Sequence, residues 1–511
     1  MVRRNIVANT LGKGWSMFMG LVFVPLYIKF LGMEAYGLIG FFATLQMVFS
    51  VLDLGLSTTL NRELARASAH PEQAEKTRDL VRTLEFVYWG IAVIIGATVI
   101  GIAPLIAHKW LNPKGLSVSS IEHVVVLLGL VTAFQWPIGF YSGGLMGLQR
   151  QMVNNVITSG LATARGAGAV LVLWLVSPTI EVYFQWQLVI SMLGVAWFAI
   201  TLWKSLPQDR VKARFRIALL RSVWSFAAGM TGISFVTLLL TQTDKILLST
   251  LLPLEVFGYY TLAGAVASAS VFVVGPMFNA VFPRFSQLAS LGDSEQLKAL
   301  YHRACQLTSV AVLPTMMVVT FFSFELLLLW TRNPLIAERA HWLVSLLAIG
   351  TALNGLMYIP YALQLAHGWT RLAFTANVIG VFLLVPLIFV LATHFGAVGA
   401  AVVWVLLNTG YVVFAVPAMH RRLLKGEMGY WYKVDIGRPL VGALPVVVLA
   451  RVLYSQDVSS FGLLAYLVGV GLTALTGAAL ATPTVRALTA HFIARQSTGR
   501  LVEWWARSSA K

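Results

Sequence analysis

The residues of this sequence that could do chemistry are the few charged side chains that interrupt long apolar runs. Arg165 lies in the middle of the run 152–176, within the small-residue stretch SGLATARGAG, and Asp53 lies in the run 37–60. An arginine at the centre of a membrane helix costs about 2.5–3.5 kcal/mol on insertion scales, and such charges usually face a cavity or a partner. We therefore predict that Arg165 and Asp53 bind substrate.

Each of these two charges has an alternative role. Arg165 could face a central cavity and attract an anionic head group, or it could bond to carbonyls or to an acid of a neighbouring helix. The small residues around it would permit close helix packing in either case. Asp53 is too short to reach the membrane surface, so it must pair, protonate or face water. It could partner Arg165 or carry a proton.

Three more charges lie near the ends of apolar runs. Asp244 and Lys245 are adjacent near the end of the run 222–250, and Glu325 lies near the end of the run 304–330. All three are candidate gate or ion-coupling residues. For Asp244 and Lys245 the alternative is an interfacial ion pair that fixes the depth of the helix.

The sequence contains no motif for catalysis. It has no Gly-rich phosphate loop ending in Lys-Ser/Thr, no pair of histidines with metal-ligand spacing and no nucleophile elbow. Cys305 is the only cysteine, so an intrachain disulfide is excluded. We expect no catalytic residue, no metal site, no cofactor and no enzymatic activity. Transport driven by ATP hydrolysis would need a separate subunit.

The elements that position these charges are predicted to be membrane-spanning helices. The chain has 511 residues, 58% of them hydrophobic and only 11% charged, whereas soluble proteins carry about 25% charged residues. Its apolar runs are long enough to cross a ~30 Å hydrocarbon core and too uniformly apolar for barrel strands. We predict an all-α polytopic membrane protein with about fourteen spans, at 13–31, 37–60, 86–107, 121–146, 152–176, 183–203, 222–250, 256–282, 304–330, 342–366, 372–393, 396–417, 439–454 and 461–481.

Positive charges are distributed unequally between the two sides of this predicted membrane. Of the 37 Lys and Arg residues, 29 lie on the side of the termini, 6 lie on the opposite side, and the remaining two, Arg165 and Lys245, lie within spans. This asymmetry predicts that both termini are cytoplasmic. The net charge of +17 then reflects orientation against an anionic leaflet, and no nucleic-acid partner is expected.

The sequence repeats itself at an offset of 221 residues. The turn at 34–37 (EAYG) has a counterpart at 255–258 (EVFG), and Arg82 matches Arg303. Six spans in each copy make a parallel repeat, because an even number brings both copies in from the same side. We predict a first six-helix bundle at 1–203, a second at 204–420, two additional helices at 421–481 and a basic cytoplasmic tail at 482–511.

Several of these motifs together resemble the polysaccharide-transport (O-antigen type) flippases of the multidrug/oligosaccharidyl-lipid/polysaccharide exporter (MOP) superfamily. The resemblance extends over about 400 residues and is carried, in order, by PLYIKFLGMEAYG at 25–37, LDLGLS at 52–57, DKILL at 244–248, FGYYTLA at 257–263 and FP at 282–283. It implies two six-helix bundles around a central cavity. It also implies that an undecaprenyl-pyrophosphate-linked oligosaccharide moves from the inner to the outer leaflet of the bacterial plasma membrane, for O-antigen, capsule or exopolysaccharide assembly.

The resemblance further implies partners, and the charges within the spans argue against two related roles. Membrane lipids are expected partners, with a polysaccharide polymerase and glycosyltransferases as further candidates. Lipid II flippases of the superfamily place arginines within span one, which holds none here. Drug/cation antiporters depend on acids in the bundle lobes, whereas the most central charge here is positive. An anionic lipid-linked sugar therefore fits better than a peptidoglycan precursor or an organic cation.

Two alternative functions remain at this point. The first is a cation-coupled small-molecule or drug exporter of the same superfamily, in which Asp53 and Asp244 would be coupling acids. The second is a membrane scaffold that holds polysaccharide assembly enzymes and transports nothing.

Overall fold

The structure is a computed structural model of the 511-residue chain that describes residues 12, 14–53, 55–67, 74–207, 212–220, 238–239, 241–268, 271–455 and 459–487. These residues form helices and their connections, with one isolated bridge between Asn112 and Pro253 and no extended strand among them. The predicted all-α fold class is therefore confirmed. The chain divides into two compact units, Met1–Thr261 and Leu262–Lys511.

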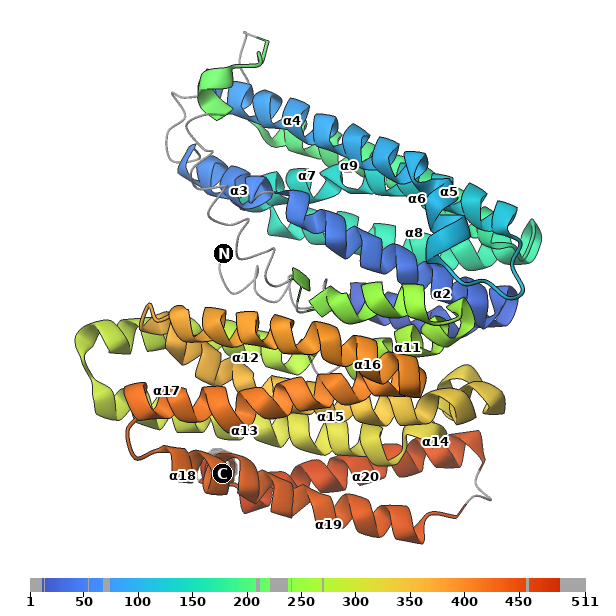
Figure 1. Cartoon of the computed structure of the whole chain (residues 1–511). Helices are drawn as coiled ribbons and strands as arrows, with labels where there is room; N and C mark the ends of the chain where they lie inside the picture. The colour runs from blue at the N-terminus through green and yellow to red at the C-terminus, as the bar shows by residue number, and fades with distance from the viewer. Residues whose placement is uncertain are drawn as a thin grey trace, which may run out of the picture. The chain divides into compact units, whose positions relative to one another are not determined.

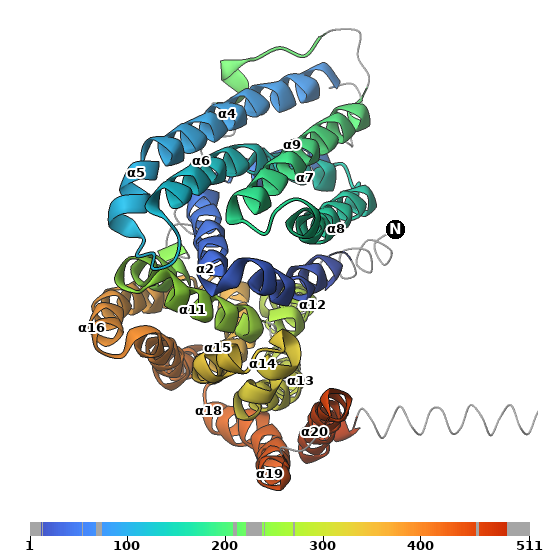
Figure 2. The ribbon, with the colours of Figure 1, turned by 90° about the vertical axis from the view of Figure 1, so that its right-hand side faces the viewer.

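In the first unit, long helices pack side by side in pairs. Helix α6 packs against α4 and α9, α8 packs against α9, and α3 packs against α7 (Figures 1 and 2). The elements are α2 Val24–Ser50, η1 Val51–Asp53, α3 Leu56–Ala67, α4 Ala74–Gly101, α5 Ala103–Leu105, η3 Ile106–Trp110, α6 Val118–Gln135, α7 Pro137–Gly147, α8 Gln151–Leu175, α9 Ile180–Ser205 and α11 Leu254–Ala267, which contains the unit boundary.

The core of the first unit is built from leucines and aromatic rings of α3, α4, α7 and α9. Leu60, Leu84, Phe140 and Leu202 are fully buried in it, and the ring of Tyr88 packs against Phe140 with centroids 4.7 Å apart. These side chains recur on one face of each helix, three or four residues apart, which is the spacing that brings apolar residues together on a helix. The cluster holds α7 and α9 in place beside α8.

In the second unit, α15 packs against α12, α13 and α16, and α19 and α20 pack together against α13 (Figure 1). A buried cluster that includes Val310 and Phe322 of this unit joins α13 to Val447 of α19 and Leu467 of α20. The elements are α12 Val271–Leu291, α13 Ser294–Phe321, α14 Ser323–Thr331, α15 Pro334–Ala366, α16 Arg371–Gly410, η5 Tyr411–Ala415, α17 Val416–Leu423, α18 Met428–Tyr430, η6 Trp431–Gly437, α19 Arg438–Leu453 and α20 Ser460–Ala481.

The chain is a multi-pass membrane protein. Its described residues contain ten helical segments that are long and apolar enough to cross a bilayer. One of them, Arg371–Leu423, has 53 residues. As one straight helix at 1.5 Å per residue it would span about 80 Å, far more than one crossing of a ~30 Å core needs. It is broken at Gly396, whose φ of +59° favours glycine, so it accommodates two predicted spans.

The number of spans stays a prediction. Segment Val24–Asp53 is likewise broken at Gly32, whose φ is +83°, and this break separates the first two predicted spans. Most of the predicted span at 222–250 lies outside the described residues, and so does the tail beyond residue 487. The predicted bundles at 1–203 and 204–420 also stay predictions, because the unit boundary lies inside α11.

Helix boundaries recur at nearly the predicted offset. Helices α4 and α13 both have 28 residues, and they begin and end 220 positions apart. Helices α8 and α16 also begin 220 positions apart. These intervals are within one residue of the 221-residue offset of the sequence repeat, so the repeat is carried into the secondary structure.

Candidate functional site

A cavity of about 560 Å³ lies in the first unit, and Arg165 lines it. Its walls come from the helical segment around Ser16, from α2, from the region where α6 meets α7, and from α8 and α9. Small-ligand sites typically have volumes of about 300–1,000 Å³ and combine apolar walls with a few polar groups. The hydrogen-bonding groups here are Ser16, Tyr27, Tyr36, Gln135, Thr158, Arg165, Tyr183 and Gln187.

Two glycines directly after Arg165 let aromatic rings approach α8 closely. A Cβ at Gly166 would collide with the ring of Phe23, and a Cβ at Gly168 would collide with the ring of Trp186. Trp186 in turn donates from Nε1 to the carbonyl oxygen of Ala164 at 3.0 Å. The small residues around Arg165 therefore serve close packing, as predicted, and this packing holds the turn of α8 that carries the guanidinium.

The guanidinium of Arg165 has no acidic partner within the described part of the chain. It is the only charged group among the described residues that line the cavity, and its Nε is buried without a hydrogen-bond partner there. A buried charge without a counter-charge is costly unless something compensates it. An anionic ligand in the cavity would supply that compensation.

Two of the aromatic residues that line the cavity, Tyr27 and Tyr183, pack against each other. The rings of Tyr27 and Tyr183 pack edge to face with centroids 5.2 Å apart, and the Tyr27 hydroxyl donates to the carbonyl oxygen of Gly166 at 3.4 Å. Gln135 lies on the same wall and accepts a hydrogen bond from Gln46 at 2.6 Å. The arrangement can hold an anionic group at the guanidinium while hydroxyl and amide groups bond a polar ligand around it.

The carboxylate of Asp53 accepts hydrogen bonds from its own chain segment. Its oxygens accept hydrogen bonds from the Ser57 hydroxyl at 2.8 Å and from the Ser57 backbone N–H at 3.4 Å. This bonding satisfies an otherwise free N–H group at the start of α3, where Gly55 takes a φ of +68°. The structure therefore does not bring Asp53 together with Arg165, and Asp53 is not among the cavity-lining residues.

Asp244 and Lys245 make separate contacts. Asp244 accepts a hydrogen bond from the hydroxyl of Tyr260 at 2.7 Å. The Lys245 ammonium donates to the carbonyl oxygen of Thr241 at 3.2 Å and to the Gln242 side chain at 3.3 Å. Among the described ion pairs, none joins these two neighbours: Asp244 bonds Tyr260 of α11, whereas Lys245 bonds residues of its own helix.

Glu325 lies at the start of α14 and pairs with an arginine of α19, one of the two additional helices predicted at 421–481, which we call the appended helices. Its Oε1 is 2.5 Å from Nη1 of Arg451 in the last turn of α19. The Glu325 side chain is only 6% exposed, while Arg451 is 41% exposed and also lies 5.4 Å from the ring centroid of Phe322. The pair connects α19 to α14 within the second unit, and a gate or ion-coupling role for Glu325 stays a prediction.

The family of the chain follows from its sequence as a whole. Residues 2–289, more than half of the chain, match the family described as polysaccharide biosynthesis protein. The chain belongs to this family. A curated relative, a putative O-antigen transporter of Shigella flexneri, is 20% identical over 409 residues, which cover 78% of this chain and 93% of the relative. The resemblance to polysaccharide-transport proteins is thereby confirmed.

Solved structures show the same fold. The lipid II flippase MurJ in an inward closed conformation is similar with a TM-score of 0.69 and 12% identity, over 93% of this chain and 98% of MurJ. An inward-facing multidrug resistance transporter of the MATE family, a member of the MOP superfamily, is similar with a TM-score of 0.67 and 14% identity, over 82% of this chain and 96% of that one. At these identities the likeness establishes the fold alone.

The polar residues around Arg165 in this family member were not singled out from the sequence. Tyr183 and Gln187 lie one turn apart on α9 and share the cavity with Gln135 of α6. Residues four apart on a helix lie on one face, so a polar pair at this spacing within the apolar run 183–203 was a usable signal. Gln135 offers no such signal, because the position of the α6 end relative to α8 is set by tertiary packing.

Proposed function

We propose that this protein is a flippase that moves an undecaprenyl-pyrophosphate-linked oligosaccharide from the inner to the outer leaflet of the bacterial plasma membrane. The single observation that carries this proposal is the Arg165 guanidinium, which lines a cavity with its Nε buried and has no acidic partner in the described chain. Membership of the polysaccharide biosynthesis protein family and the transporter fold support it. The product would be used for O-antigen, capsule or exopolysaccharide assembly.

Each part of the proposed substrate has a chemical counterpart. Arg165 binds the pyrophosphate, because a guanidinium matches phosphate oxygens in two-point contact. Tyr36, Tyr183 and Gln187 bond sugar hydroxyls with their own hydroxyl and amide groups. The polyprenyl chain stays in the bilayer, since in the cavity of about 560 Å³ it would desolvate the Arg165 charge and the hydrogen-bonding groups of the lining.

The proposal includes orientation and surroundings. The protein is placed in the bacterial inner membrane with both termini in the cytoplasm, because 29 of its 37 Lys and Arg residues lie on that predicted side. The two bundles alternate access to the cavity as the superfamily fold suggests. Glycosyltransferases that build the lipid-linked unit and a polymerase that consumes it are the proposed partners, and the protein itself carries out no covalent chemistry.

A cationic drug is a poorer substrate for this cavity. The charge that lines it is positive. Of the two acids that a cation exporter would use, Asp53 bonds Ser57 at the start of α3 and Asp244 bonds Tyr260, and neither lines the cavity. A like charge in the cavity would repel an organic cation. The charge of the site therefore favours an anionic substrate.

The decisive experiment compares Arg165 variants in a deletion strain. Membrane abundance and surface polysaccharide are measured on the same cells for wild type, Arg165→Ala and Arg165→Lys. Arg150→Ala is the matched control, because Arg150 is an exposed arginine that directly precedes the same helix. We expect Arg165→Ala to keep its abundance while surface polysaccharide falls about tenfold or more, the effect of losing one charge-assisted hydrogen-bonded contact. Lipid-linked repeat units should then accumulate on the inner leaflet.

The lysine variant separates binding from structure. A point charge replaces only part of a two-point contact, so Arg165→Lys should restore part of the activity. If Arg165→Ala has normal membrane abundance and normal surface polysaccharide, Arg165 has no role in transport. Equal loss of abundance and polysaccharide would assign Arg165 a structural role.

A further inference from the structure

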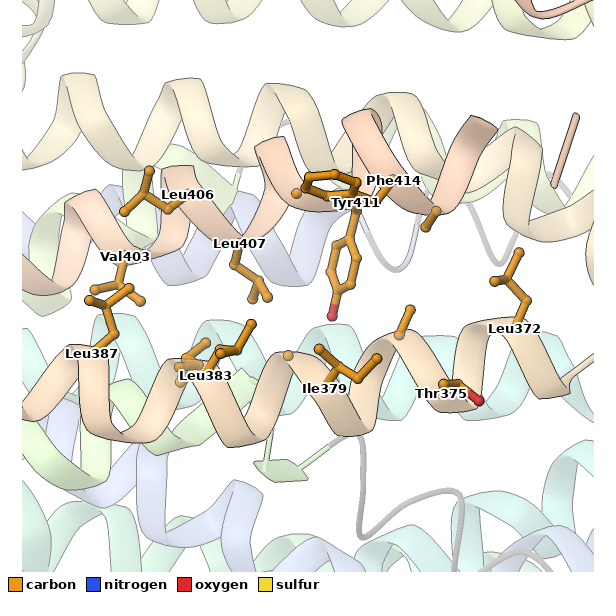
Figure 3. A pocket seen from close by; sticks show the side chains of 15 residues that line it. Leu372, Thr375, Ile379, Leu383, Leu387, Val403, Leu406, Leu407, Tyr411 and Phe414 are labelled. Atoms are coloured by element: carbon orange, nitrogen blue, oxygen red, sulfur yellow. The ribbon is translucent and has the colours of Figure 1, made fainter. Parts of the chain in front are cut away.

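A second cavity lies entirely within the second unit, between the two arms of α16. The arms meet at the Gly396 break, where a Cβ at Gly399 would collide with the carbonyl group of Leu391. Away from this contact they separate and leave a groove of about 490 Å³. Figure 3 shows Ile379 and Leu383 of the first arm facing Leu407 of the second arm and Tyr411 of η5, which continues that arm, across this space. We call it the α16 groove.

The walls of the α16 groove are hydrocarbon, and many of them are not covered by the protein. Ile379 is 53% exposed, Leu383 65% and Phe414 76%. The hydroxyl groups on the lining belong to Thr375 and Tyr411, and Tyr411 donates its own to the Asn377 side chain at 3.1 Å. In a segment long enough to cross the membrane twice, such a surface faces the hydrocarbon chains of lipids.

One end of the α16 groove leads to exposed basic residues. Arg371 directly precedes the lining residue Leu372, and Arg422 lies two helical turns beyond the lining residue Ala415. The Arg422 guanidinium lies 4.3 Å from the ring centroid of Trp369, so the loop before the first arm and the helix after the second arm are adjacent. Arginine with tryptophan at the end of a membrane helix is typical of the level of the lipid head groups.

The nearby acid, Glu427, already has basic partners other than Arg371 and Arg422. Glu427, the acid that follows this basic segment, lies 3.7 Å from Lys298 and 3.3 Å from His302. Arg371 and Arg422 make no ion pair within the described part of the chain, and both side chains are exposed. An apolar channel that ends at unpaired arginines is complementary to a molecule with a hydrocarbon chain and an anionic head.

We propose that the α16 groove binds one anionic phospholipid of the surrounding leaflet, with an acyl chain along the groove and the phosphate at Arg371 and Arg422. This site goes beyond the proposed transport function. It is formed by the second unit alone and shares no residue with the Arg165 cavity. An anionic head is favoured over a neutral one because each basic residue near a membrane surface contributes about a fivefold preference for anionic lipid.

The test uses the full-length protein in detergent. Phosphatidylglycerol or phosphatidylcholine is added, and bound lipid is counted by native mass spectrometry. We expect one phosphatidylglycerol to be retained in preference to phosphatidylcholine. The Arg371→Ala and Arg422→Ala variants should each lose about fivefold of that preference. Arg332→Ala, which removes an exposed arginine elsewhere in the same unit, should keep it.

A second variant fills the groove without changing charge. Ala376→Phe places a ring on the groove lining, whereas Val385→Phe places the same ring on the same arm outside the lining. Only Ala376→Phe should lose the retained phosphatidylglycerol, and both variants should melt like wild type in lipid-free detergent. Arg165→Ala should retain the lipid as wild type does, which separates this proposal from the transport proposal.

Three outcomes would overturn the proposal. Equal retention of the two phospholipids would remove the role of the arginines, and retention by Ala376→Phe would place the lipid elsewhere. If a polyprenyl phosphate is retained while phosphatidylglycerol is not, the groove belongs to the substrate rather than to the surrounding leaflet.

Discussion

Gly37 and Gly258 lie against each other, and a Cβ on either glycine would be 3.2 Å from the amide nitrogen of the other. The next contacts are equivalent as well, since the Cβ of Gly37 would meet the carbonyl of Leu254 and that of Gly258 the carbonyl of Met33. Gly37 and Gly258 are 221 positions apart, and so are Met33 and Leu254. A contact in which residue i meets j and j meets i is the mark of a two-fold relation. The two turns of the sequence repeat therefore contact each other through equivalent residues.

Replacing either glycine should destabilise the protein. In Gly37→Ala and Gly258→Ala the new methyl group would press on backbone atoms, which cannot move aside as a flexible side chain can. We expect a loss of about 1–3 kcal/mol for each, as for other overpacked sites. Thermal unfolding in detergent measures it. Gly90→Ala in α4 is the control, because no described heavy atom lies within 4 Å of its added methyl group. An unchanged melting temperature in both Gly37→Ala and Gly258→Ala would show that the two turns are not packed this closely.

The ion pair between Glu325 and Arg451 leads to a prediction about the appended helices. Arg451→Gln should leave the Glu325 carboxylate, which is 6% exposed, without its partner. We expect the free energy of unfolding to fall by about 1.5–3 kcal/mol, the range for a hydrogen bond to a charged group. The double variant Glu325→Gln/Arg451→Gln should recover part of this loss, because it leaves no buried charge without a partner. Additive losses in this double-mutant cycle would show that the two residues do not interact.

The sequence predicted the position of Arg165 at a cavity better than it predicted the surroundings of Asp53. Arg165 was identified because a charge in the middle of an apolar run is visible in one dimension, and it does line a cavity. Asp53 was read as a possible partner of Arg165 within a continuous span. The chain breaks at Gly55 instead, and the Asp53 carboxylate bonds Ser57. The stretch LDLGLS contains the Asp, Gly and Ser that such a break uses, so this role was recoverable from turn chemistry.

Long-range partners were beyond prediction from one sequence. Glu325 and Arg451 are 126 positions apart, and nothing local to either residue indicates the other. The repeat was predictable because it is a comparison of the sequence with itself, and α4 and α13 recur with equal lengths. The appended helices lie in the segment 421–481, which the sequence predicts to stand outside the repeat. Their contacts with α13 depend on tertiary packing, and no local pattern in the sequence predicts these contacts.

A buried network where α13 meets η6 should also contribute to stability. The Asp435 carboxylate, fully buried, lies 2.5 Å from His302 Nδ1 and accepts from Gln306 Nε2 at 2.9 Å. Asp435→Ala would leave both groups without their partner, so we expect a loss of about 3–5 kcal/mol in the free energy of unfolding. Glu295→Gln is the control, because this glutamate is 84% exposed in its pair with Lys298 and should change stability by less than about 1 kcal/mol. Similar melting temperatures for the two variants would contradict a structural role for the network.

The orientation in the membrane is testable by cysteine labelling. The wild type carries only Cys305, which is 4% exposed, so background labelling should be low. The charge asymmetry of the sequence predicts that cysteines at Gln73, Val211 and Gly426 react only with reagent on the cytoplasmic side. Gln73 and Val211 lie outside the described residues. Gly426 has a φ of +86°, where a cysteine would be strained, so the exposed neighbour Lys425 is the better position.

Positions on the opposite side can be chosen from the structure in the same way. The sequence points to Asn112 and Asn333, but both side chains have structural roles. Asn112 donates to the carbonyl oxygen of Thr250 at 2.8 Å, and Asn333 caps the start of α15.

Two exposed neighbours avoid these roles. Lys114→Cys and Leu335→Cys should therefore be labelled in intact spheroplasts by a reagent that does not cross membranes. Lys425→Cys should be labelled only after the membrane is opened. Labelling of Lys425→Cys in intact spheroplasts would reverse the proposed orientation, and with it the direction of transport.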